Sequence, residues 1–62
     1  MKKIELRKVS KGGYFRFRDY ENSPLWVRDI YDPSCKRYVV FKSENVNGWS
    51  LRKGSLMVYV EE

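Results

Sequence analysis

Apolar residues recur at every second position along most of the chain, which is the period of a β-strand with one buried face. Residues that favour turns separate these runs at intervals of about eight to twelve residues, as in an all-β meander. No run has a helical period, although one helical turn is considered around Val46 in the polar connector 43–48. The pattern predicts strands at residues 3–7, 14–18, 25–31, 37–42, 49–51 and 56–60.

The connectors contain the residues that turns and loops require. The sequence SKGG at residues 10–13 predicts a tight turn, because glycine adopts positive φ without a steric penalty. Residues 32–36 (DPSCK) predict a hairpin with Pro33 at the second position of its turn. Residues 19–24 (DYENSP) have no period and are expected to form a loop.

The length of the chain limits its fold. We expect a single domain, residues 1–62, and a chain this short buries only about 60% of the surface that its unfolded form exposes. Its apolar residues are mostly β-branched or aromatic, as strands prefer. A two-layer sandwich needs a longer chain, whereas closure into a barrel removes exposed strand edges. We therefore expect a five- to six-stranded SH3-like barrel, with an OB-like barrel as the alternative.

The alternation also assigns side chains to the core or to solvent. Phe15 and Phe17 are expected to point inward on the second strand, and Leu25 and Val27 on the third. Asp29 shares the inward side, so we expect the third strand to bend near its end or Asp29 to pair with a cation. The expected core positions of the last strand are Leu56, Val58 and Val60.

The chain is basic. Thirteen Lys and Arg residues against eight Asp and Glu residues give a net charge of +5. Such an excess favours polyanions, nucleic acid among them. A net charge of this size is also ordinary for a small domain, so charge alone does not assign a partner.

The strands at 14–18, 25–31 and 37–42 are consecutive, so we expect them to be neighbours with one common outward surface. Aromatic rings are expected there among four arginines, without an acidic residue. Guanidinium groups bind phosphates and flat rings stack on bases, so this combination is typical of single-stranded nucleic-acid binding. The candidate binding residues are Tyr14, Arg16, Arg18, Trp26, Arg28, Arg37 and Phe41, with Ile30 and Val39 between them.

The same surface has other interpretations. Trp, Tyr, Phe and Arg are enriched at protein interfaces, so it also fits a protein partner or a second copy of the chain. Alternatively, it is only the solvated side of a sheet, where aromatic and Arg pairs stabilise neighbouring strands. A shift of one residue would turn Trp26 into the core. Trp49 and Tyr59 are expected to be partly buried at the ends of the barrel.

Several short motifs carry a resemblance to known proteins. The sequence VSKGGYF at residues 9–15 is similar to the opening of many small SH3-like barrels. The further motifs are VR (27–28), YDPS (31–34), KRY (36–38), NVN (45–47), KG (53–54) and VY (58–59). Together they resemble a family of uncharacterised small proteins of gut bacteria and their phages. The resemblance implies an SH3-like fold and an accessory protein of a phage or mobile element, and it assigns no functional residue.

Catalytic and metal chemistry has few candidate residues in this chain. It contains no histidine, and its single cysteine, Cys35, cannot form a zinc site or an internal disulfide. Gly12 and Gly13 precede a predicted strand, whereas a phosphate-binding loop precedes a helix. We therefore expect a non-catalytic binding module without cofactor or metal. The lone cysteine, the absence of a signal peptide and apolar runs of only about four residues predict a cytoplasmic protein that does not enter a membrane.

Overall fold

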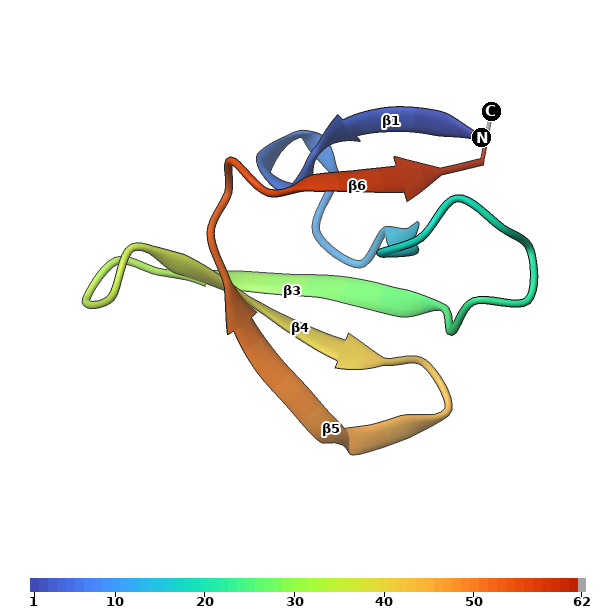
Figure 1. Cartoon of the computed structure of the whole chain (residues 1–62). Helices are drawn as coiled ribbons and strands as arrows, with labels where there is room; N and C mark the ends of the chain where they lie inside the picture. Colours follow the sequence, from blue (N-terminus) through green and yellow to red (C-terminus); the bar gives the residue numbers. More distant parts are fainter. Residues whose placement is uncertain (62) are drawn as a thin grey trace.

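The chain folds into β-strands and one short 3-10 helix, in a computed structural model that describes residues 1–61 apart from the side chain of Val46. In chain order the elements are β1 (Lys2–Glu5), η1 (Leu6–Lys8), β2 (Tyr14–Phe15), β3 (Trp26–Asp32), β4 (Arg37–Lys42), β5 (Asn45–Arg52) and β6 (Met57–Val60). The prediction of an all-β fold is therefore confirmed (Figure 1).

The strands form two antiparallel sheets. One sheet has the order β2-β3-β4-β5, and the other pairs β1 with β6 (Figure 1). Arg16, directly after β2, joins them, because its backbone exchanges two hydrogen bonds of 2.8 Å with Tyr59 of β6. Within residues 1–61 the outer edges of β1 and β5 are not paired with each other, so the sheet does not close into the expected barrel.

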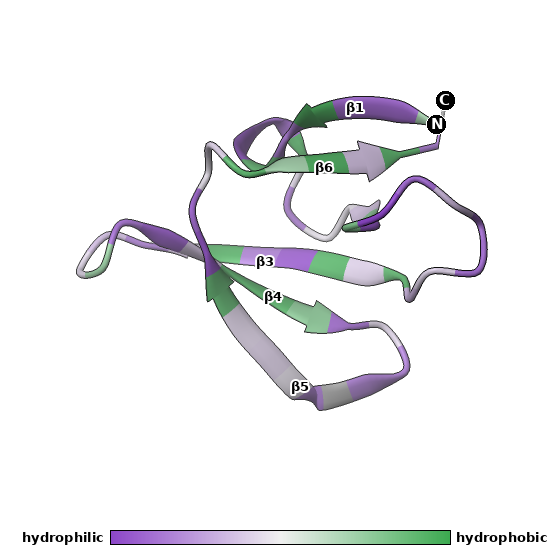
Figure 2. Ribbon diagram, viewed as in Figure 1, coloured by the Kyte–Doolittle hydropathy of each residue, from purple (hydrophilic) through white to green (hydrophobic). Residues whose placement is uncertain are grey.

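The core takes side chains from both sheets and from η1. Leu6, Val9, Phe15, Val40 and Val58 are buried, with at most 6% of each residue exposed. Burial of a side chain of this size contributes about 1.5–3 kcal/mol. The predicted core positions Phe15 and Val58 are confirmed, and Figure 2 shows hydrophobic segments on β3, β4 and β6. Partly buried around this core are Ile4, Phe17, Trp26, Tyr38, Leu56 and Val60.

The first turn needs both of its glycines. Gly12 has a φ of 84°, in the left-handed region that side chains with a Cβ atom rarely adopt. A Cβ atom on Gly13 would lie 2.8 Å from the carbonyl oxygen of Ser10. The N–H of Gly12 donates to the carbonyl of Arg28 at 2.7 Å, and the N–H of Arg28 donates to the carbonyl of Gly13 at 3.0 Å. The turn is thus held against β3 and sets the register of β2.

Three strands differ markedly in extent from the prediction. β1 ends at Glu5, so residues 6–7 of the expected strand 3–7 lie in η1 instead. β2 covers only residues 14–15 of the expected strand 14–18, because the chain leaves β3 at Arg16 to pair with β6. β5 begins at Asn45 and runs through the connector, so the helical turn considered around Val46 is not formed. Turn residues 33–36 join β3 to β4, which confirms the hairpin.

Candidate nucleic-acid interface

The register between β2 and β3 reverses the predicted faces of β3. Trp26 lies directly opposite Phe15, and Arg28 lies opposite Val40. Residues opposite each other in an antiparallel pair point to the same side, and both Phe15 and Val40 are buried. The expectation that Trp26 and Arg28 point outward and Val27 inward is therefore wrong. The large Trp26 ring buries more apolar surface than Val27 does, which favours this register.

Arg28 has a structural contact on this inner side. The carbon of its guanidinium group lies 4.4 Å from the centre of the Tyr38 ring, within the range of a cation–π interaction. Its Nε atom is buried and makes no hydrogen bond within the described residues. Arg28 therefore does not belong to the solvent-facing surface that the sequence predicts.

The end of β3 contains a bulge. Asp29 and Ile30 together oppose Val39, because the register shifts between Arg28 and Tyr31. Both lie on the outer side of the strand with Val27, so the expectation that Asp29 shares the inward side is wrong, whereas Ile30 is 51% exposed, as predicted.

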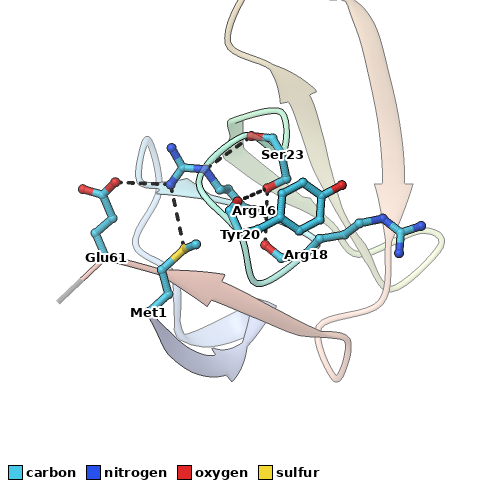
Figure 3. Close-up of polar contacts among 6 residues, drawn as sticks. All are labelled: Met1, Arg16, Arg18, Tyr20, Ser23 and Glu61. Carbon is cyan, nitrogen blue, oxygen red and sulfur yellow. Dashed lines mark hydrogen bonds and ion pairs between the residues drawn. The ribbon is translucent and has the colours of Figure 1, made fainter.

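Arg16 is held by the chain itself. Only 14% of its side chain is exposed. The Nε–H group of Arg16 donates to the carbonyl of Ser23 at 3.3 Å, and its Nη1 atom lies 3.2 Å from a carboxylate oxygen of Glu61 and 4.0 Å from Sδ of Met1. Figure 3 shows these groups around Arg16, with the side chain of Arg18 extending in the opposite direction. Arg16 is therefore not the solvent-facing cation of the prediction.

The loop that contains Ser23, the hydrogen-bond partner of Arg16, is also stabilised by hydrogen bonds between its own residues. The hydroxyl of Ser23, a buried residue, donates to the carbonyl oxygens of Tyr20 at 2.9 Å and Arg18 at 3.3 Å (Figure 3). These bonds fix the backbone from which the exposed side chains of Arg18 and Tyr20 project.

The outer face of the four-stranded sheet is apolar rather than basic. One residue from each strand forms a continuous line of opposed pairs across this face. We call these four residues the outer row: Tyr14 of β2, Val27 of β3, Phe41 of β4 and Trp49 of β5. Tyr14 and Phe41 lie on this face as predicted. Trp49 is 60% exposed, so its expected partial burial is wrong, whereas Tyr59 is half-buried as expected. Arg37 is the only predicted arginine on this face, and it lies opposite Asp32.

The cations and rings gather instead on the inner side of the same sheet, between Lys42 at the end of β4 and Arg52 at the opposite end of the hairpin, where β5 ends. They surround a cleft of about 520 Å³ that opens to solvent. Among the described residues, no acidic side chain lines it. We define the basic–aromatic cleft by its charged and aromatic lining residues, which are Phe17, Arg18, Tyr20, Trp26, Lys42 and Arg52.

The centre of the cleft is an aromatic pair with a cation on each side. The ring centres of Phe17 and Trp26 lie 5.0 Å apart, with their planes at 68°. The Nζ atom of Lys42 lies 5.9 Å from the centre of the Trp26 ring. The guanidinium carbon of Arg52 lies 5.0 Å from the centre of the Phe17 ring. Both rings are half-buried, and both cations belong to exposed residues.

The strand pairing explains why these cations face inward. Lys42 is the last residue of β4 and lies opposite Trp26, and Arg52 is the last residue of β5 and lies opposite Tyr38. Each occupies an inward position at the end of its strand, where a long side chain covers a ring with its stem and keeps its charge in water.

The positive charge of the cleft is not neutralised by an ion pair within the described part of the chain. The ion pairs found there join Arg7 to Glu5 and Arg16 to Glu61. Arg18, Lys42 and Arg52 form none. Three cations therefore face solvent around half-buried aromatic rings.

Sequence reasoning found only part of this cleft. Arg18 and Trp26 belong to the predicted site, and Phe17 was expected in the core, where it is half-buried. Lys42 and Arg52 were missed. Each is a cation at an inward position at the end of a strand. This feature could identify them only once the register of the strands is known.

Comparisons with protein-family models, with curated proteins and with solved structures found no match to the chain. The resemblance to small proteins of gut bacteria and phages therefore stays a prediction. Residues 1–61 contain no group of three or more His, Cys, Asp or Glu side chains placed to hold a metal ion. No helix among these residues is long and apolar enough to cross a membrane.

Proposed function

We propose that this protein is a small, non-catalytic module that binds single-stranded nucleic acid in the basic–aromatic cleft. The observation that carries the proposal is the arrangement of Lys42, Trp26, Phe17 and Arg52, in which an aromatic pair lies between two cations. Rings supply stacking surfaces for bases and cations supply partners for phosphates.

The shape of the cleft favours an unpaired strand. The rings of Phe17 and Trp26 are half-buried, so a base reaches them only when it is free of a complementary strand. A volume of about 520 Å³ lies within the range of pockets that hold small molecules, which matches a unit as small as a nucleotide. Tyr20, which is 51% exposed, offers a further ring at the rim.

Single-stranded nucleic acid is the partner that the sequence suggested, but we expect it in the basic–aromatic cleft and not on the outer face of the sheet. In the described part of the chain, the outer face has one arginine, which lies opposite an aspartate, whereas the cleft combines three cations with no acid. For the fold we propose an open, SH3-like arrangement. Two features support this arrangement. They are the order of the short antiparallel strands and the passage of the chain at Arg16 from the four-stranded sheet to pairing with β6.

Anisotropy of a labelled single-stranded oligonucleotide tests the proposal. With three phosphate contacts, the slope of log K against log salt is expected near −2, because each contact on a single strand contributes about −0.7. Binding should thus weaken about 20-fold between roughly 50 and 200 mM salt. Arg52→Ala should reduce the slope by about 0.7.

A matched control uses another exposed cation. Lys11 lies in the first turn and does not line the cleft, so Lys11→Ala should leave the slope close to that of the unmodified protein. Tyr20→Ala should weaken binding about 5- to 150-fold, the equivalent of about 1–3 kcal/mol for one stacked base. Absence of binding at low salt, or equal losses in Lys11→Ala and Arg52→Ala, would contradict the proposal.

A further inference from the structure

The outer face of the four-stranded sheet is a second candidate surface, separate from the cleft. It contains the outer row together with Ile30 at the bulge and the opposed pair Val39 and Leu51. Tyr14 is 59% exposed, Trp49 60% and Ile30 51%. The face is therefore a continuous set of apolar and aromatic side chains that reach solvent, the composition that marks an interaction surface.

Few charges lie on this face, although the chain has thirteen Lys and Arg residues. The charged residues at its described outward strand positions are Asp29, Asp32 and Arg37. A polyanion finds little attraction here. Two copies of a chain with a net charge of +5 repel each other, and they do so least where cations are scarce.

The small core gives a further reason for contact between copies. Five hydrophobic residues among those described are buried, whereas seven apolar or aromatic residues lie on the outer face, where Tyr14, Ile30 and Trp49 are exposed. Short chains that bury little surface commonly gain stability from association. Sheets pack face to face at about 10 Å through interdigitating apolar side chains.

From the low charge of the face and its apolar row we infer that a second copy of this chain covers it. The two sheets then pack through their outer rows in a symmetric dimer, with the same patch used by both copies. The two basic–aromatic clefts face outward on opposite sides of this dimer, because each lies on the inner side of its sheet. The inference does not depend on what the clefts bind.

Sedimentation equilibrium over a range of protein concentrations tests this dimer. Trp49→Lys and Ile30→Lys each place a cation in the interface twice. Each should raise the dimer dissociation constant about a hundredfold or more. The control is Asn22→Lys, which adds the same charge at an exposed loop position and should leave the constant within about twofold.

The outcomes separate the possible occupants. A dimer that the two outer-face variants dissociate, that Asn22→Lys preserves and that high salt does not weaken supports a second copy on this face. A strict monomer at about 1 mM overturns the inference, because a constant above that value corresponds to less than about 4 kcal/mol of binding. A dimer equally strong in both outer-face variants also overturns it. Circular dichroism verifies the fold of each variant. If one of the two outer-face variants does not fold, the other still tests the interface.

Discussion

Phe15 and Trp26 lie directly opposite each other on β2 and β3, and both side chains contribute to the core or pack against it. This pair decides which side every other side chain of β3 takes, up to the bulge after Arg28. It turns Val27 to the outer face and Trp26 toward Phe17. The aromatic and cationic side chains that the sequence assigned to one surface therefore divide between an apolar face and a basic cleft.

Substitutions at this pair test the register through stability. Phe15→Ala should lower the free energy of unfolding by about 3–5 kcal/mol, because Phe15 is 1% exposed and its loss leaves a cavity. A small domain has a total stability of about the same size, so this variant should be largely unfolded. Trp26→Ala should cost about 2–4 kcal/mol, since its ring is half-buried. Urea denaturation followed by circular dichroism measures both.

The neighbouring Tyr14 provides the control. It lies on the opposite face at 59% exposure, so Tyr14→Ala should cost less than about 1 kcal/mol at concentrations where the protein is monomeric. A cost for Trp26→Ala no larger than that for Tyr14→Ala would show that Trp26 points to solvent, as the sequence alone suggested.

A second prediction concerns the loop that forms one wall of the cleft. Arg16→Ala removes the hydrogen bond to the carbonyl of Ser23 and the contact with Glu61. The amide of Ser23, which donates to the carbonyl of Tyr20 at 3.2 Å, should then exchange its hydrogen faster, because the loop opens more often. Hydrogen exchange followed by NMR measures this rate.

Glu61→Gln separates the loop contact from the ion pair. Glu61 is 76% exposed on its side chain, and exposed ion pairs contribute less than about 1 kcal/mol, so exchange at Ser23 should change little. If Arg16→Ala left the exchange rate of Ser23 unaltered, the anchoring role of Arg16 would have to be abandoned.

A third prediction concerns pH and the hairpin between β3 and β4. The Ser34 hydroxyl donates to Oδ1 of Asp32 at 2.6 Å and the Ser34 backbone N–H does so at 3.0 Å. These bonds favour the carboxylate and hold the pKa of Asp32 below its ordinary value. Because the folded pKa is lowered, the stabilisation is present above the unfolded pKa of about 4 and is lost as the pH falls through the folded pKa.

An NMR titration of the Asp32 carboxyl carbon measures this pKa directly. Ser34→Ala removes the hydrogen bond from the Ser34 hydroxyl, the largest cause of the lowering, so the pKa of Asp32 should rise toward its ordinary value. Ser43→Ala, at the turn between β4 and β5, is the matched control and should leave it unchanged. An equal pKa in the unmodified protein and in Ser34→Ala would rule out the hydroxyl as the cause.

Much of the fold could be predicted from the sequence because alternation and turn residues act locally. The strand 37–42 and the hairpin at Pro33 appear where the pattern places them. The faces of β3 could not be predicted in the same way. Trp26 and Val27 are both apolar, so alternation allows either to face the core, and only the pairing with Phe15 selects Trp26.

The candidate site was harder to predict than the fold, because its members meet only through the topology. Lys42 and Arg52 end different strands, and Tyr20 lies in a loop without any period. Their proximity to Phe17 depends on where the chain leaves β3 to join β6, which no local pattern reveals. The composition nevertheless indicated the residue types that gather in the cleft.

The two tryptophans allow the most direct test of the proposed cleft. Trp26 lies inside it, and Trp49 lies on the outer face, so their indole N–H signals in a ¹H–¹⁵N NMR spectrum report on the two sides of one sheet. Signal assignment comes from Trp26→Phe and Trp49→Phe. During titration with a single-stranded oligonucleotide at low salt, the Trp26 signal should shift progressively while the Trp49 signal stays in place. A shift at Trp49 with none at Trp26, or no shift at either, would contradict nucleic-acid binding in the cleft.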